Sequence, residues 1–211
     1  MASPPSNFWD AWFDGKDFTS DWSSSRFSTW TSVLAELVNT DIKILEIGSW
    51  EGRSAVFFLE YMPRSSITCI DTFEGSPLLR SISKWNAAIP HSQMRFDSNL
   101  LPYGNRVEKI CSSSLVAFPA LIQSGRRFDL IYIDGSHDRD DVLVDTVLSW
   151  RLLNESGILI WDDYTYPGPR SPKIAIDAFL TMNAGEFDEL HRGKQVIIKK
   201  RVKAFTPLLE L

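Results

Sequence analysis

Acidic residues follow three short apolar runs of this chain. The runs end at Asp71, Asp134 and Asp162, and a further acid, Asp163, follows the last one directly. A fourth apolar run, residues 42–47, leads into a glycine turn at 48–52, GSWEG. If the runs are parallel strands, their carboxyl ends meet at one edge of a sheet, where ligand crevices form in open α/β proteins. The sequence therefore predicts an acidic, ligand-binding edge beside a glycine turn.

Asp71 and the glycine turn predict a nucleoside site. An acid at the end of a second strand can accept the hydroxyls of a ribose. A dinucleotide turn has the pattern G-x-G-x-x-G, whereas this chain has Glu46-x-Gly48-x-x-x-Gly52, with Glu51 placed where it would repel phosphate. S-adenosylmethionine carries adenosine without phosphates, together with an ammonium and a sulfonium cation. The motif therefore favours S-adenosylmethionine as the cofactor, with Glu46 near its cationic end.

Asp134, Asp162 and Asp163 predict a second site. Carboxylates from neighbouring strand ends can converge on Mg²⁺, which takes oxygen ligands at about 2.1 Å. Without a cation, three carboxylates this close would repel one another. The alternative is that these aspartates only cap nearby turns, as Asp often does. We expect Mg²⁺ or another divalent cation, with Asp134 also counted among the catalytic residues.

His137 follows Asp134 by three residues and is the candidate general base. An imidazole with a pKa of about 6.5 can accept a proton from a substrate hydroxyl, and a metal lowers the pKa of that hydroxyl. The competing interpretation is a surface or capping histidine. His91 and His191 have no comparable neighbours, so no role is assigned to them.

The elements that must position these residues alternate along the chain. Apolar periodicity and turn residues predict helices and strands in alternation, with an irregular segment at 74–105. Helices are expected at 28–38, 53–61, 114–123, 140–153 and 174–182, and strands at 42–47, 67–71, 107–111, 130–134, 158–161, 187–190 and 195–199. This order predicts an α/β fold: a doubly wound, mostly parallel, Rossmann-like sheet with an antiparallel C-terminal strand pair.

The length of 211 residues suits a single domain at 31–211, preceded by an aromatic-rich extension at 1–30. The extension holds four of the eight tryptophans: Trp9, Trp12, Trp22 and Trp30. Aromatic residues at this density usually bury themselves on their own domain or on a partner subunit. We expect packing, with a homo-oligomer contact as one form of it, rather than a lid over a ligand.

Composition excludes several classes of protein. The net charge of -5 and the single short basic run, 199–201, argue against nucleic acid as a partner. No apolar run reaches 18 residues and the N-terminus lacks signal-peptide features, so no membrane partner is expected. Cys69 and Cys111 lie in apolar runs and are predicted to be buried, reduced thiols. These features together fit a cytoplasmic protein.

The motifs resemble those of class I S-adenosylmethionine-dependent methyltransferases, in particular the metal-dependent small-molecule O-methyltransferases. The similarity runs from about residue 22 to residue 199 and includes ILEIGSWEGRSAV, CIDTFEG, DLIYIDGSH and GILIWDDY. Catechol-type members have lysine at the position of His137 and asparagine at that of Asp163, so the antibiotic- and sugar-tailoring members are more similar. The resemblance implies cofactor contacts from Glu46, Gly48, Gly52, Ser54, Asp71 and Ser113, and Mg²⁺ ligands Asp134, Asp162 and Asp163.

The resemblance implies methyl transfer to a hydroxyl of a small molecule. The acceptor oxygen would attack the sulfonium methyl in line, with His137 or another base removing its proton. Two alternatives stay open: a metal-independent N- or O-methyltransferase, and a non-catalytic S-adenosylmethionine-binding protein. A nicotinamide dehydrogenase ranks last, because Glu51 and the missing middle glycine both oppose it.

Overall fold

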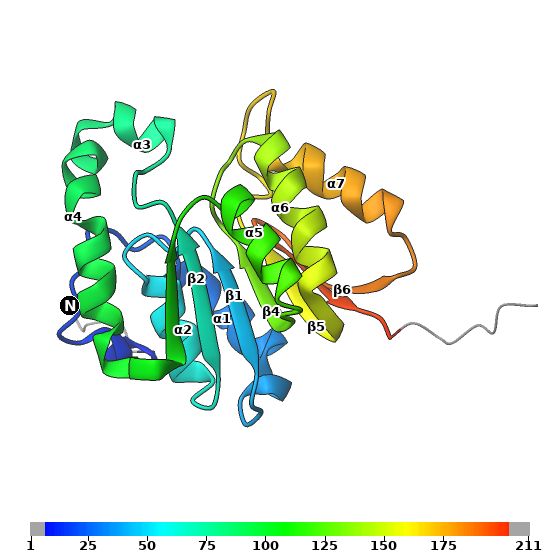
Figure 1. Cartoon of the computed structure of the whole chain (residues 1–211), viewed down its shortest axis with the longest axis horizontal. Helices are drawn as coiled ribbons and strands as arrows, with labels where there is room; N and C mark the ends of the chain where they lie inside the picture. The colour runs from blue at the N-terminus through cyan, green and yellow to red at the C-terminus, as the bar shows by residue number, and fades with distance from the viewer. Residues whose placement is uncertain (1–6, 203–211) are drawn as a thin grey trace, which may run out of the picture. The chain divides into compact units, whose positions relative to one another are not determined.

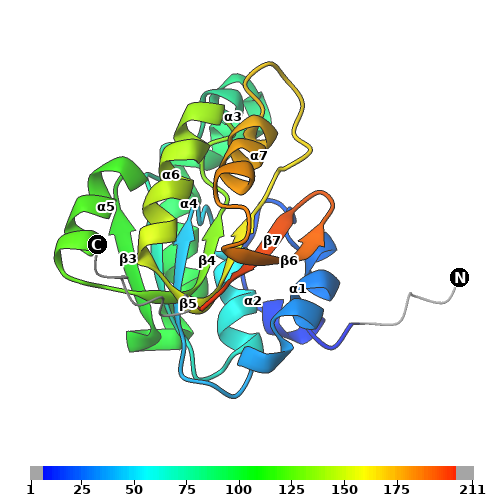
Figure 2. The same ribbon diagram turned by 90° about the vertical axis from the view of Figure 1, so that its right-hand side faces the viewer.

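The computed structural model describes residues 7–202, so the first six residues of the expected N-terminal extension lie outside the described part (Figures 1 and 2). The chain divides into two compact units, Met1–Ala117 and Phe118–Leu211. Seven strands occur within the described residues. The expected α/β class is confirmed: most strand pairs are parallel, and the C-terminal strands pair antiparallel.

The first unit contains three parallel strands in the order β3-β2-β1. Its strands are β1 (Lys43–Ile47), β2 (Ser66–Asp71) and β3 (Val107–Cys111), and its main helices are α1 (Phe27–Val33), α2 (Arg53–Tyr61), α3 (Pro77–Ser81) and α4 (Ser83–Leu100). Short 3₁₀ turns span Asp10–Phe13, Ser24–Arg26, Ala35–Leu37 and Leu101–Arg106. Parallel pairing puts the last residue of β1, Ile47, opposite Ile70, so the glycine turn and Asp71 leave the sheet at the same edge.

The aromatic N-terminal segment packs against helix α2 in this unit. Phe57 stacks on Phe27 at a ring-centroid distance of 4.2 Å, and Trp30 stacks on Phe58 at 4.8 Å. Trp12 meets Phe57 edge to face at 5.7 Å. Four of these five side chains are fully buried, and Trp12 is half-buried. This aromatic cluster therefore fixes α2, and with it the C-terminal side of the glycine turn.

The second unit contains the strands β4, β5, β7 and β6 in that order. Its elements are β4 (Phe128–Ile133), α6 (Arg139–Leu152), β5 (Leu153–Trp161), α7 (Pro172–Met182), β6 (Phe187–Arg192) and β7 (Val196–Lys200); α5 (Ser114–Gln123) spans the boundary between the units. Figure 2 shows α6 and α7 side by side, and the two helices contact each other. Ile133 lies opposite Trp161 in the parallel pair β4–β5. Asp134 and Asp162 therefore leave neighbouring strand ends, as expected.

Most element boundaries agree with the sequence-based expectations, but the segment 74–105 does not. It was expected to be irregular, yet it contains α3 and the 18-residue helix α4. The buried residues of α4 are Ala88, Ser92, Phe96, Asn99 and Leu100. Their spacing is helical, but Ser92 and Asn99 are polar and Pro90 lies inside the helix, so apolar periodicity alone does not reveal it.

One cysteine also differs from expectation. Cys69 is buried on β2, whereas Cys111 is exposed at the end of β3. Within its unit β3 pairs only with β2, so β3 is an edge strand. The residues of β3 are half-buried or exposed. In the described part of the chain, no helix is both long enough and apolar enough to cross a bilayer.

Candidate functional site

The glycine turn is fastened to Asp71 by backbone hydrogen bonds. The Trp50 N–H donates to Oδ2 of Asp71 at 2.7 Å, and the Phe73 N–H donates to Oδ1 at 2.6 Å. Burial raises the pKa of the Asp71 carboxyl, and these N–H donors oppose the rise. The Ser49 N–H is a third backbone donor to this carboxylate, which leaves one lone pair for a ligand hydroxyl. Asp71 is thus held at the strand end in a fixed orientation.

Glu46 is fully buried on β1. Ser54 donates a short hydrogen bond to Oε1, and the Cys69 thiol lies 3.5 Å from Oε2. Burial raises the pKa of Glu46 to about 7, although neighbouring hydroxyl and thiol groups oppose this shift and Asp71 adds to it. Glu46 and Ser54 were expected to line the cationic end of the cofactor. The structure brings them into contact with each other, but the Glu46 side chain has no exposed surface.

Two glycines give the turn its shape. Gly48 and Gly52 have φ of 85° and 82°, a conformation that favours glycine. A Cβ atom on Gly52 would lie 2.8 Å from Cδ2 of Leu100, so helix α4 approaches this backbone closely. Ser113 is exposed after β3, and its carbonyl accepts the N–H groups of the first turn of α5. These bonds join Ser113 to α5 and not to the turn, and its expected adenine contact stays a prediction.

Glu51 differs from expectation. Its carboxylate was expected to act in the turn and repel phosphate, but it is 1% exposed and binds the N-terminal segment. The Thr19 N–H and hydroxyl donate to its two oxygens at 2.6 and 2.9 Å, and Arg95 of α4 donates at 3.3 Å. Asn99 donates to the Glu51 carbonyl at 3.0 Å. Since its charge is already paired, the case against a dinucleotide rests on Trp50, which stands at the middle-glycine position.

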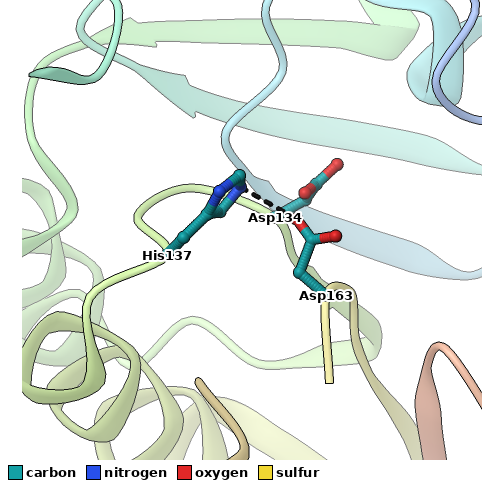
Figure 3. A group of neighbouring side chains, drawn as sticks. All are labelled: Asp134, His137 and Asp163. Carbon is teal, nitrogen blue, oxygen red and sulfur yellow. Dashed lines mark ion pairs between the residues drawn. The ribbon is translucent and has the colours of Figure 1, made fainter. Parts of the chain in front are cut away.

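The second unit brings together Asp134, His137 and Asp163 (Figure 3). One potential ligand atom from each residue lies within 4.8 Å of the others. His137 Nε2 is 2.8 Å from Oδ2 of Asp163, and both side chains are about one-third exposed, at 34% and 29%. Asp163 has φ of 54°, which turns the chain sharply after β5. We call these three residues the acidic group.

Asp162, the third expected metal ligand, is not in the acidic group. Its Oδ1 accepts the Asp163 N–H at 2.8 Å, and its Oδ2 lies 2.8 Å from the Tyr132 hydroxyl. The same hydroxyl lies 2.8 Å from Oδ2 of Asp134. Tyr132 therefore links the acids at the ends of β4 and β5. Burial, followed by the charges of these acids, raises the Tyr132 pKa well above its ordinary value, so the phenol keeps its proton.

His137 combines opposing influences on its pKa. Burial lowers it, but the hydrogen bond and charge of Asp163, together with the charge of Asp162, raise it above 6.5 overall. The imidazole also lies 4.7 Å from the Tyr166 ring. When the carboxylate of Asp163 accepts a proton from Nε2, the neutral ring has Nδ1 as its basic atom. This pairing of an acid with an imidazole can orient a general base.

Sequence reasoning missed Tyr132 and the partners of Glu51. A signal existed for Tyr132, because it precedes Asp134 by two residues and residues at i and i+2 share one face of a strand. No comparable signal links Thr19 or Arg95 to Glu51, since they lie 32 and 44 residues away along the chain.

Comparisons of the sequence and of the fold with known proteins found the following relatives. An uncharacterized protein of Acanthamoeba polyphaga mimivirus is 27% identical over 138 residues, covering 63% of this chain and 58% of the relative, so this chain spans less than two thirds of that protein. The structure of an O-methyltransferase from Bacillus cereus in complex with S-adenosylhomocysteine (SAH) has a TM-score of 0.63 at 14% identity, covering 87% of this chain and 84% of that one. MycE methyltransferase from the mycinamycin biosynthetic pathway, in complex with Mg and SAH, has a TM-score of 0.62 at 15% identity, covering 92% and 53%.

These structural neighbours confirm the Rossmann-like methyltransferase fold. A family model described as a methyltransferase domain matches residues 45–164, from β1 through the acids that follow β5. The match includes the glycine turn, Asp71 and the whole acidic group. Because it covers more than half of the chain, this protein belongs to the methyltransferase domain family.

Proposed function

We propose that the protein is an S-adenosylmethionine-dependent O-methyltransferase that acts on a hydroxyl of a small molecule and uses a divalent cation, with Mg²⁺ as the first candidate. The observation that carries the proposal is the glycine turn fastened to Asp71 at the ends of β1 and β2. Membership of the methyltransferase domain family supports the reaction class. The neighbours solved with SAH, one of them also with Mg, support the choice of cofactor and metal.

The first unit suits a nucleoside with a cationic tail. Asp71 keeps an acceptor site for a ribose hydroxyl, and its backbone partners hold it in place. Glu46 adds a buried acid behind the turn, where its charged form would be favoured by a nearby cation. A phosphate has no cationic partner in the turn itself, because the residues of GSWEG carry no positive side chain.

The donor set of the second unit fits a hard divalent cation. Asp134 and Asp163 supply carboxylate oxygens, which Mg²⁺ and Mn²⁺ prefer, with water completing the coordination. Asp162 lies behind them on Tyr132 and adds negative charge. Imidazole is a poorer partner for Mg²⁺ than oxygen. We therefore assign Asp134 and Asp163 as ligands and keep His137 as the base, with Asp162 as a supporting acid.

The bound groups would supply a sulfonium methyl as the electrophile and a Lewis acid that lowers the pKa of the acceptor hydroxyl. Asp71 would bind and orient the nucleoside. His137 would take the hydroxyl proton at Nδ1 while Asp163 holds Nε2, so that a C–O bond forms as the S–C bond breaks and SAH leaves. Tyr132 would keep Asp134 and Asp162 in register through its protonated phenol.

A metal-free O-methyltransferase is the second candidate. The His137–Asp163 pair is already formed at 2.8 Å and could serve as a general base without a cation. In that case the carboxylates of the acidic group would orient the imidazole rather than bind a metal.

Release of SAH from S-adenosylmethionine in the presence of a mixture of small hydroxylated acceptors tests the proposal. The assay is run with Mg²⁺ and with EDTA, on the wild type, His137→Ala and Asp134→Asn. Asp41→Asn is a matched control, because Asp41 is an exposed acid paired with Arg64. We expect turnover that EDTA and Asp134→Asn reduce at least tenfold and that the control leaves unchanged.

The other outcomes separate the candidates. Turnover that resists EDTA but is lost in His137→Ala would favour the metal-free base. SAH binding without turnover on any acceptor would favour the cofactor-binding protein. Tight binding of NAD with no binding of SAH would overturn the proposal.

A further inference from the structure

Three tryptophans gather around the glycine turn of the first unit. Trp22 of the N-terminal segment lies 5.9 Å from Trp50 of the turn and 4.8 Å from Trp85 of α4, measured between ring centroids. Three separate parts of the chain therefore contribute one indole each. We call Trp22, Trp50 and Trp85 the indole cluster.

The indole cluster is not part of the hydrophobic core. Trp22 is 46% exposed, and Trp50 and Trp85 are half-buried, whereas Trp30 is completely buried. Trp22 is nevertheless held in place: Arg53 binds the neighbouring Asp21 through two hydrogen bonds of 3.0 Å. An apolar surface that is both exposed and ordered is typical of a binding site.

Trp50 is placed at an energetic disadvantage. Its φ is 48°, in the left-handed region that a bulky residue adopts at a cost of about 1–2 kcal/mol. Its indole Nε1–H is shielded from solvent and has no hydrogen-bond acceptor among the described residues. Its backbone N–H donates to Asp71. A strained backbone and an unsatisfied buried donor at one residue are typical of a functional site rather than of a position selected for stability.

A positive charge lies at the edge of the cluster. Lys84 Nζ is 4.3 Å from the centroid of the Trp85 ring, and Lys84 forms no ion pair with any described residue. Its ammonium group can therefore pair with an anionic substituent on a ligand. Indole faces favour a planar ring, because stacked and edge-to-face aromatic contacts add about 0.5–1.5 kcal/mol beyond burial.

We propose that the indole cluster binds a planar aromatic molecule that carries a negatively charged group, and that this molecule is the acceptor or an analogue of it. The identification of this molecule as the methyl acceptor rests on the proposed function. Its binding to the indole cluster can be measured without turnover. The ring would contact the exposed Trp22, and the anionic group would face Lys84.

Calorimetry with three matched probes tests the site. The probes are para-hydroxybenzoate, neutral para-cresol, and hydroxycyclohexanecarboxylate, which keeps the charge and hydroxyl but lacks the planar ring. None of them chelates a metal through adjacent hydroxyls, and EDTA is present throughout. We expect para-hydroxybenzoate to bind most tightly and the saturated analogue most weakly, both with and without saturating SAH.

Variants locate the binding. Trp22→Leu and Trp85→Leu should each weaken para-hydroxybenzoate binding about tenfold and leave the affinity for SAH unchanged. Lys84→Met should weaken the anionic probe toward the level of para-cresol. Phe8→Leu removes an exposed aromatic ring of the same N-terminal segment that contacts Trp9 and Trp12 instead, and should leave binding unchanged.

Each contrary result is decisive. Equal binding of the aromatic and saturated probes, or unchanged binding in both indole variants, would overturn the proposal. Competition between SAH and the probe would assign the cluster to the cofactor instead. Light scattering that shows a dimer in the wild type and a monomer in Trp22→Leu would make the cluster a subunit contact. Failure of SAH to bind at all would count against the proposed function and leave the probe result to decide this inference.

Discussion

Replacing Glu51 with glutamine should release the N-terminal segment from the glycine turn. In the protein, one carboxylate oxygen accepts the Thr19 N–H at 2.6 Å, and the other accepts the Thr19 hydroxyl at 2.9 Å and Arg95 at 3.3 Å. A glutamine has one acceptor oxygen and an NH₂ group with two donor hydrogens. If its oxygen faces the hydroxyl, its NH₂ group meets the Thr19 N–H; if its oxygen faces the N–H, its NH₂ group meets the Arg95 guanidinium. Two donors meet in either orientation.

The expected loss follows from these contacts. Hydrogen bonds to charged groups contribute roughly 1.5–3 kcal/mol each, and an unsatisfied buried donor costs about 1–3 kcal/mol. Even if only one contact is lost and one donor stays unsatisfied, the loss is about 3 kcal/mol. This corresponds to about a 100-fold increase in the opening equilibrium of the segment.

Hydrogen exchange of the Thr19 amide measures this opening directly. We expect the Thr19 amide to exchange about 100-fold faster in Glu51→Gln. Amides of β2, such as that of Ile70, should change much less, because local and global opening are separate events. Glu74→Gln is the control, since the Glu74 side chain is exposed and forms an ion pair with the exposed Arg80.

Two results would refute this reasoning. Unchanged exchange at Thr19 in Glu51→Gln would mean that the carboxylate does not hold the segment. An equal increase at Thr19 and Ile70 would mean that the variant destabilises the whole unit rather than releasing one segment.

Three further predictions follow from buried or constrained groups. Burial raises the pKa of Glu46 to about 7 in the folded protein, so the folded state binds a proton that the unfolded state releases, and the free energy of unfolding should fall as pH rises from about 4.5 to about 7. Glu46→Gln should reduce this pH dependence in denaturation curves measured at pH 5 and 8. An unchanged pH dependence would contradict the assignment. In the native protein Cys111 should react with a thiol reagent and Cys69 only after unfolding, and fast reaction of both would disprove the burial of Cys69. Gly52→Ala should lower stability by about 1–3 kcal/mol in thermal unfolding, because of its φ of 82° and the 2.8 Å approach to Leu100, whereas a neutral result would mean that α4 moves away freely.

Residue pattern alone predicts the strands of this protein well, because each apolar run ends in an acid or a turn. Helix α4 is not predicted from the sequence, because its buried face includes the polar residues Ser92 and Asn99 and because Pro90 lies within the helix. The strand ends place Asp134 and Asp162 on neighbouring strands, but side-chain direction decides which acids converge. Tyr132 contacts both Asp134 and Asp162, and His137 rather than Asp162 lies with Asp134 and Asp163 in the acidic group, a result that depends on packing rather than on spacing.

Binding of SAH to the wild type and to Asp71→Asn, measured by calorimetry, tests the central claim most directly. The glycine turn and Asp71 should bind one SAH per chain. Asp71→Asn should lose at least tenfold in affinity, because one acceptor oxygen for the ribose is replaced by a donor, while Asp41→Asn binds like the wild type. Absence of SAH binding in the wild type, or equal affinity in Asp71→Asn, would contradict the account.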